Sequence, residues 1–88
     1  MNIEILHIHR THCFLHLMKR AKTRNIDLNA AAAHSLQEAI QRMEPVFVRA
    51  GQSRYRLPVR HHGRWLIVTY DARLHCLVTV WRDQKRVW

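Results

Sequence analysis

The sequence predicts an α+β fold in which two N-terminal helices pack on one face of a roughly four-stranded antiparallel sheet. In the first half of the chain, apolar residues recur three and four positions apart, which is the period of an amphipathic helix. In the second half, apolar and polar residues alternate between short turn sequences, as they do in half-buried strands. The 88 residues suffice for one small core, so we expect a single domain over residues 1–88.

The first helix is predicted from Thr11 to Arg24. Thr11 is a suitable N-cap. The apolar side chains that follow it have the i, i+3, i+4, i+7 spacing of one helix face: Phe14, Leu17, Met18 and Ala21. The preceding segment, residues 3–8, is too short for its period to distinguish a strand from an additional helical turn. Asn25 is expected to end the helix in a left-handed conformation.

The second helix is predicted to begin at an Asp27 N-cap and to end before Pro45. Asp is a favoured N-cap because its carboxylate accepts hydrogen bonds from the free amides of the first turn. The alanines at 30–33 add high helix propensity. Proline disfavours the α conformation at the residue before it, so the helix should stop there.

Four strands are predicted in the second half, over residues 46–50, 54–60, 65–70 and 75–82. They are separated by short turn sequences: Gly51-Gln52-Ser53, His61-His62-Gly63 and Asp71-Ala72-Arg73. Loops this short join antiparallel neighbours, so the strands should form a meander. Pro58 lacks an amide donor, which favours an edge position or a bulge for its strand.

Alternation also predicts which strand side chains share a face. Three basic residues of the strand at 54–60 point away from its apolar side and should form an arginine stripe for nucleic acid: Arg54, Arg56 and Arg60. His61 and His62 in the following turn would extend this stripe. In the last strand, Thr79 is the only hydroxyl and shares a face with Leu77 and Trp81. Thr79 is either a functional group or an ordinary β-forming residue.

Net charge is the strongest global indication of function. Fifteen Lys and Arg against six Asp and Glu give a formal charge of +9, and twelve of the fifteen are Arg, whose planar fork binds phosphate bidentately. Such an excess indicates a polyanionic partner, and we expect RNA. An acidic protein partner and a genomic bias toward Arg are the alternatives.

The sequence gives no indication of a membrane span. No stretch approaches 18 consecutive apolar residues. The opening MNIEILHIHR also lacks the basic and then apolar pattern of a secretory signal. We therefore expect a protein without membrane contact that is cytoplasmic, in the producing cell or in a target cell.

One face of the first helix is predicted to bind an anion. His16, Arg20 and Arg24 are four residues apart, so they lie one above another along the helix. Like charges at this spacing weaken a helix slightly, so their alignment favours an anionic partner over a stabilising role. A plain solvated basic face is the alternative.

A metal site is another possible use of the same helix. His9, His12, Cys13 and His16 have the i, i+3, i+4, i+7 spacing of one face, provided that the helix includes His9. Zinc sites normally take ligands from more than one segment and have supporting carboxylates, so we expect no metal and no cofactor. Cys13 and Cys76 are expected to be free thiols, with a disulfide in an oxidising setting as the alternative.

The remaining residue types favour chemistry that needs no metal. Six scattered acidic residues argue against a catalytic carboxylate pair, and no Gly-rich phosphate loop is present. RNA can be cleaved by attack of the ribose 2′-OH on its own phosphate, which needs a base, an acid and cations around the phosphoryl oxygens. Arg, His, Tyr and Thr can supply these groups.

Two segments resemble a known family. HLMKRAKTRNID, residues 16–27, resembles the helix signature H-A-x-x-R-M-x-x-R-G-I-S of a small bacterial domain family related to the RelE-type toxins and, more remotely, to the barnase, EndoU and colicin nuclease group. GRWLIVTYDARLHCLVTVW, residues 63–81, is similar to the closing hairpin of that family. The resemblance covers about residues 12 to 82, with Ala21 and Asn25 in place of the usual Met and Gly.

The resemblance implies a RelE-like domain and a metal-independent ribonuclease toxin that an acidic antitoxin or immunity protein neutralises. By this resemblance, His16 would match the motif His, Arg20 and Arg24 the two motif Arg, and Thr79 the Thr of the last strand. Tyr70 is a further candidate to contact the scissile phosphate or to position the ribose. The alternative function is a non-catalytic nucleic-acid-binding module, such as a regulator or a phage accessory protein, that uses the same arginine surface.

Overall fold

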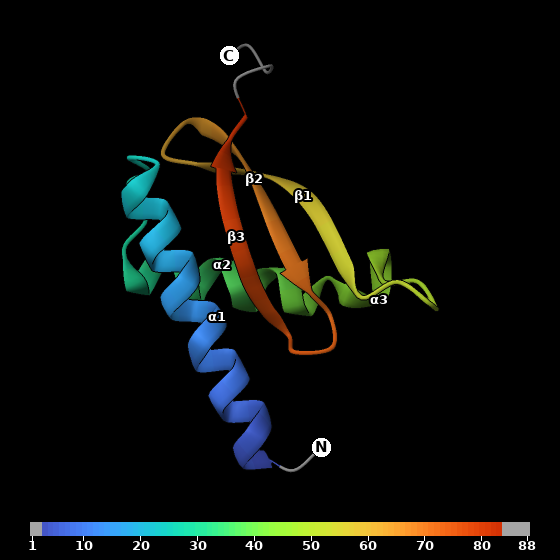
Figure 1. Cartoon of the computed structure of the whole chain (residues 1–88). Helices are drawn as coiled ribbons and strands as arrows, with labels where there is room; N and C mark the ends of the chain where they lie inside the picture. Colours follow the sequence, from blue (N-terminus) through green and yellow to red (C-terminus); the bar gives the residue numbers. More distant parts are fainter. Residues whose placement is uncertain (1–2, 84–88) are drawn as a thin grey trace.

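The computed structural model describes residues 3–83, with their side chains from residue 8 onward, and has an α+β architecture. The elements follow the order α1 (Ile3–Thr23), α2 (Ala30–Arg42), α3 (Glu44–Phe47), β1 (Arg54–His61), β2 (Arg64–Asp71) and β3 (Cys76–Arg82). The strands form an antiparallel sheet in the order β1-β2-β3. In Figure 1, α2 crosses behind the sheet, and α1 runs beside β3.

The α+β class is confirmed, but the number of strands is not. Within residues 3–83 the sheet has three strands rather than four, because, in the segment predicted as a strand over 46–50, residues 46–47 end α3 and residues 48–50 form an irregular segment that leads into a turn. Pro45 occupies the first turn of α3, where its missing amide is not needed and its fixed φ suits a helix. The proline that was expected to end one helix therefore begins another.

The helices begin and end at positions that differ partly from the sequence-based expectation. α1 begins at Ile3, so residues 3–8 form additional helical turns rather than a strand. Asn25 has a φ of 55°, which confirms its predicted left-handed conformation. The predicted Asp27 cap is wrong: Asn29 is the N-cap of α2, and its side chain accepts a hydrogen bond from the Ala32 amide at 2.8 Å. Residues 26–29 connect the two helices, and the Asp27 carboxylate lies beside His62 instead of at the start of α2.

A β-bulge alters the predicted faces of β3. Thr69 pairs with Thr79, but its neighbour Tyr70 pairs with Leu77, so one additional residue of β3 lies between these pairs. Leu77 consequently shares the buried face with Val80 instead of lying beside Thr79. The expectation that Leu77 and Thr79 share a face was wrong because strict alternation does not anticipate an inserted residue.

The core lies between the helices and one face of the sheet. α1 contributes Leu17 and Ala21, and the fully buried part of the core also includes side chains from β2 and β3: Val68, Tyr70, Leu77 and Val80. The opposite side of the sheet, which we call the open face, carries half-buried or exposed side chains: Arg56, Trp65, Ile67, Thr69, Thr79 and Trp81. Among the described residues, no helix has the length and apolar character required to cross a membrane.

Candidate nucleic-acid interface

Arg24 ties the end of α1 to the outer edge of the sheet. One terminal nitrogen of its guanidinium donates hydrogen bonds to Thr79 Oγ1 at 3.0 Å and to the Val80 carbonyl oxygen at 2.8 Å. Within residues 3–83, β3 is an edge strand, so this carbonyl faces no described partner strand on its outer side. Arg24 therefore satisfies a carbonyl of the edge strand and is itself held in one orientation.

Trp81 lies against the guanidinium groups of two arginines from different elements. The guanidinium carbon of Arg24 is 4.7 Å from the centroid of the Trp81 ring, and that of Arg56 is 5.5 Å away. The strand register explains the contact between Arg56 and Trp81. Arg56, Thr69 and Thr79 lie side by side on three neighbouring strands, and Trp81 is two residues beyond Thr79 on the same face. We refer to Arg24, Arg56 and Trp81 as the Arg–Trp cluster.

The Arg–Trp cluster keeps hydrogen-bond donors available. Both bonds from Arg24 use the same terminal nitrogen, which leaves Nε and the other terminal nitrogen as a bidentate fork. The Arg56 guanidinium forms no hydrogen bond or ion pair with any described residue. The guanidinium groups of Arg24 and Arg56 thus both lie against the Trp81 indole, and neither has a carboxylate among its described partners. This arrangement favours an anionic ligand.

Arg20, with His16 beside it, extends the polar surface along α1. The Arg20 Nε group donates to His16 Nε2 at 3.4 Å, and both side chains are exposed. The helical spacing continues from His16 through Arg20 to Arg24, which contacts Thr79. Four of the five residues predicted as catalytic therefore lie along one row from α1 to β3.

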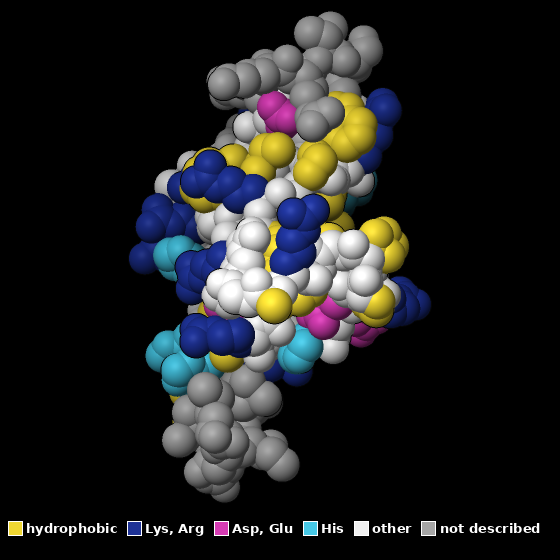
Figure 2. Space-filling model, turned by 90° about the vertical axis from the view of Figure 1, so that its right-hand side faces the viewer, with side chains coloured by type: hydrophobic (Ala, Val, Ile, Leu, Met, Phe, Trp, Pro, Cys, Tyr) yellow, Lys and Arg dark blue, Asp and Glu magenta, His cyan; other side chains and the backbone are white. Residues whose placement is uncertain are grey.

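Figure 2 views the molecule from the side of β1 and α3. Lys and Arg side chains gather along the left margin of this view, which is the side that faces the viewer in Figure 1, opposite α2. Few acidic side chains are visible beside them. Basic side chains therefore lie on the face of the molecule opposite α2.

Tyr70, the fifth predicted residue, lies elsewhere. Its side chain is fully buried on the helix-covered face of the sheet, and its hydroxyl donates to Glu44 Oε1. The same oxygen accepts a hydrogen bond from His75 Nδ1 at 2.6 Å. The expectation that Tyr70 contacts a phosphate together with Thr79 is corrected, because adjacent β2 positions point to opposite faces and Tyr70 follows Thr69.

The hydrogen bonds among Tyr70, Glu44 and His75 shift two pKa values in opposite directions. Burial raises the pKa of Glu44, but the hydrogen bonds from Tyr70 and His75 and the nearby charge of His75 outweigh that effect and hold the pKa below 4.5. Burial, together with the hydrogen bond to the Glu44 carboxylate, raises the pKa of Tyr70 well above 10. Tyr70 therefore remains a neutral donor that anchors α3 to β2.

We expect the free energy of unfolding to fall at both ends of the pH range. The lowered pKa of Glu44 gives a contribution that is present above about pH 4.5 and lost as acid protonates the folded carboxylate. The raised pKa of Tyr70 gives a contribution that is present below about pH 10 and lost as the pH rises further. Urea denaturation at a series of pH values measures both losses. Tyr70→Phe should reduce the alkaline loss, leaving the part that the raised pKa of Cys76 contributes, and Tyr55→Phe should retain the full loss; the opposite pattern would contradict this assignment.

The predicted arginine stripe is only partly available. Arg54 Nε lies 3.3 Å from Oδ2 of the fully buried Asp71, so this arginine is engaged at the end of the strand. Arg60 lies over the Trp65 ring, with its guanidinium carbon 5.8 Å from the centroid. Arg56 is the member of the stripe that meets Trp81.

His61 and His62 do not extend the arginine stripe. His61 occupies the sheet position that faces away from Arg60, and its Nε2 lies 2.8 Å from the Asp27 carbonyl oxygen. His62 stacks on His61 with ring centroids 3.9 Å apart. The prediction is corrected because the hairpin turn reverses the chain and turns both rings toward the segment between α1 and α2.

Two other sequence-based expectations concern the cysteines and metal binding. Cys13 and Cys76 are free thiols, as expected, and burial and a hydrogen bond with Cys13 raise the pKa of Cys76 to about 12. No group of three or more His, Cys, Asp or Glu side chains in the described part of the chain is arranged to hold a metal ion. This finding includes the helical set of His9, His12, Cys13 and His16.

Sequence reasoning missed the role of Trp81. Its i+2 spacing from Thr79 identified the shared face, but a contact with two arginines depends on the strand register and on the position of α1. The contribution of the Val80 carbonyl oxygen had no signal in the sequence, because every residue carries such a group.

Comparisons of the chain with protein-family models, curated proteins and solved structures found no match. The chemistry of the open face is therefore the basis for the functional conclusion.

Proposed function

We propose that this protein binds single-stranded RNA through the open face of its sheet. The observation that carries the proposal is the Arg–Trp cluster, in which Arg24 and Arg56 meet at Trp81 without a carboxylate partner among the described residues. Stacked guanidinium groups present their N–H edges outward, where phosphate oxygens can accept them. The formal charge of +9 supplies the long-range attraction to a polyanion.

The shape of the open face favours an unpaired strand. Two half-buried tryptophans, Trp65 and Trp81, lie there beneath arginines, and guanidinium planes can stack on bases that are not paired. Arg20 continues from this face along α1, so the backbone of a bound strand would meet a further cation beyond the Arg–Trp cluster. In duplex RNA the base faces are buried in the helical stack, so they cannot stack on such a surface.

A second candidate function is metal-independent cleavage of RNA by a RelE-like toxin. The row that links His16, Arg20 and Arg24 to Thr79 supports it, since a proton-transfer group and two phosphate-binding cations lie along one course. In this reading, His16 accepts the 2′-OH proton and the two arginines hold the phosphate. Thr79 acts as a positioning residue, because its hydroxyl accepts a hydrogen bond from Arg24. An acidic antitoxin or immunity protein would neutralise such a toxin by covering the same cations.

One experiment tests binding and cleavage together. The protein is incubated in EDTA with a labelled single-stranded RNA over a range of salt concentrations, and both the affinity and the length of the RNA are measured. Arg56→Gln should reduce the salt dependence by about 0.7 in the slope of log affinity against log salt, which corresponds to one phosphate contact on a single strand. Arg42→Gln is the matched control, because Arg42 is exposed on α2 and should leave the slope unchanged.

Each outcome of this experiment decides between the proposals. Equal slopes for Arg56→Gln and Arg42→Gln would show that the open face is not the binding surface. RNA fragments that His16→Ala abolishes, while affinity is retained, would support cleavage. RNA that stays intact through long incubation with a tightly bound protein would leave binding as the function and reject cleavage.

A further inference from the structure

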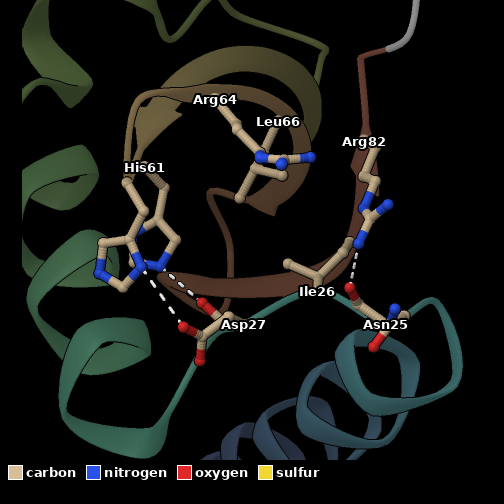
Figure 3. A pocket seen from close by; sticks show the side chains of 8 residues that line it. Asn25, Ile26, Asp27, His61, Arg64, Leu66 and Arg82 are labelled. Atoms are coloured by element: carbon tan, nitrogen blue, oxygen red, sulfur yellow. Dashed lines mark hydrogen bonds and ion pairs between the residues drawn. The ribbon is translucent and has the colours of Figure 1, made fainter.

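A second cationic site lies on the other side of the sheet, where the turn between β1 and β2 meets the segment between α1 and α2. It is a half-open pocket of about 280 Å³. Its lining residues come from four segments of the chain: Asn25, Ile26, Asp27, His61, His62, Arg64, Leu66 and Arg82. Figure 3 shows His61, Arg64 and Arg82 placed around one space, with Asp27 and Ile26 along its lower side.

Local backbone conformation builds this pocket. The left-handed Asn25 turns the chain sharply after α1, while His62 and Gly63, with φ values of 50° and 73°, form the tight turn between β1 and β2. His61 Nε2 then reaches the Asp27 carbonyl oxygen at 2.8 Å, which fixes Nε2 as the donor and holds the two segments together. Buried Leu66 adds an apolar surface to the lining.

The positive charge in the pocket exceeds the negative charge that the lining residues supply. The Arg64 guanidinium makes no hydrogen bond or ion pair with any described residue. Arg82 donates from one terminal nitrogen to the Asn25 carbonyl oxygen, and its other donors have no described acceptor. Asp27 is the only acidic residue of the lining, and its exposed carboxylate lies 3.5 Å from His62 Nδ1. Two guanidinium groups therefore face one carboxylate that is already beside an imidazole.

We propose that this pocket binds a phosphomonoester, the terminal phosphate of a nucleotide. Arg82 pairs across the strands with Leu66, and Arg64 is two residues before Leu66 on the same face, so the two guanidiniums flank one apolar side chain. A phosphomonoester has three terminal oxygens that accept hydrogen bonds from different directions, whereas a carboxylate is satisfied by a single fork. The guanidinium groups of Arg64 and Arg82 come from different strands and approach this space from separate sides.

The form of the pocket favours the end of a nucleotide chain or a free mononucleotide over the middle of a strand. The β1–β2 turn closes one side and the segment at 25–27 closes another, while buried Ile26 and Leu66 offer an apolar surface to a sugar or base. None of the Arg–Trp cluster residues lines it, and Arg82 points to the opposite face from Trp81. This proposal therefore stands independently of RNA binding on the open face.

An NMR titration of the full chain tests the site. Amide signals are followed while inorganic phosphate, uridine 5′-monophosphate or, as a control, uridine is added. We expect saturable shifts at residues 25–27 and 61–64 with the phosphate and the monophosphate but not with uridine. Arg64→Gln should weaken the binding of the monophosphate about tenfold, because a charge-assisted fork is lost. Arg64 has no described polar partner, so this variant should keep its fold.

Arg42→Gln removes the same charge far from the pocket and should change the affinity less than twofold. Equal weakening in the two variants, or shifts that do not saturate, would overturn the proposal. The source of the phosphate is distinguished by comparing 5′-phosphorylated and 5′-hydroxyl RNA oligonucleotides. A preference for the 5′-phosphate that Arg64→Gln abolishes identifies a chain end, and binding of the free mononucleotide alone identifies a small-molecule ligand. Arg56→Gln should leave the monophosphate affinity unchanged even if the open face binds no RNA.

Discussion

Replacing Arg24 by Met should weaken the binding of single-stranded RNA by roughly 30-fold, equivalent to about 2 kcal/mol. The substitution removes a fork that is held beside Trp81 and tied by hydrogen bonds to Thr79 and to the Val80 carbonyl oxygen. Lys at this position keeps the charge but lacks the planar fork, so we expect Arg24→Lys to recover only part of the affinity. Fluorescence titration with a labelled oligonucleotide at fixed salt measures these changes.

Lys22→Met is the matched control for this result. Lys22 is exposed on the last turn of α1, and its loss changes the net charge by the same amount. We expect a change in affinity below threefold, since a lone exposed charge contributes little at physiological salt. If Lys22→Met and Arg24→Met weaken binding equally, net charge alone attracts the RNA and the Arg–Trp cluster has no special role.

Leu17→Ala should lower the free energy of unfolding by about 3 kcal/mol. The Leu17 side chain is 0% exposed and belongs to the core cluster in which α1 meets the sheet. Truncation there removes buried apolar surface and leaves a cavity that neighbouring side chains fill only in part. In a domain of this size, such a loss lowers Tm by roughly 12 to 24 °C, which thermal and urea denaturation can measure.

Leu15→Ala tests whether this loss depends on burial. Leu15 is on the same helix but is 61% exposed, so its truncation should cost less than about 0.5 kcal/mol. Similar losses for the two variants would mean that α1 does not pack on the sheet as described. Because α1 carries Arg24 to β3, Leu17→Ala should also weaken RNA binding at temperatures where the protein is still mostly folded.

Parts of the candidate site could be predicted because their geometry is local. The spacing of four that aligns His16, Arg20 and Arg24 depends only on the period of the helix, and the left-handed Asn25 depends on the tolerance of Asn for that conformation. Tyr70 could not be placed in the same way. Whether a strand residue faces substrate or core depends on which face the helices cover, and an equally regular alternation fits either choice.

The sequence by itself determined the α+β class, the antiparallel hairpins over 54–82 and the basic character of the protein. These features follow from periods of hydrophobicity, short turn sequences and charge count, each of which acts over a few residues or over the whole composition.

Only the tertiary structure decided which cations act together. It brought Arg24 and Arg56 to Trp81, engaged Arg54 with Asp71, and turned His61 and His62 toward a different pocket. The physical reason is that contacts between distant segments depend on strand register, on the bulge in β3 and on the way α1 docks beside that strand. These properties are set by packing of the whole core, so no window of sequence contains them.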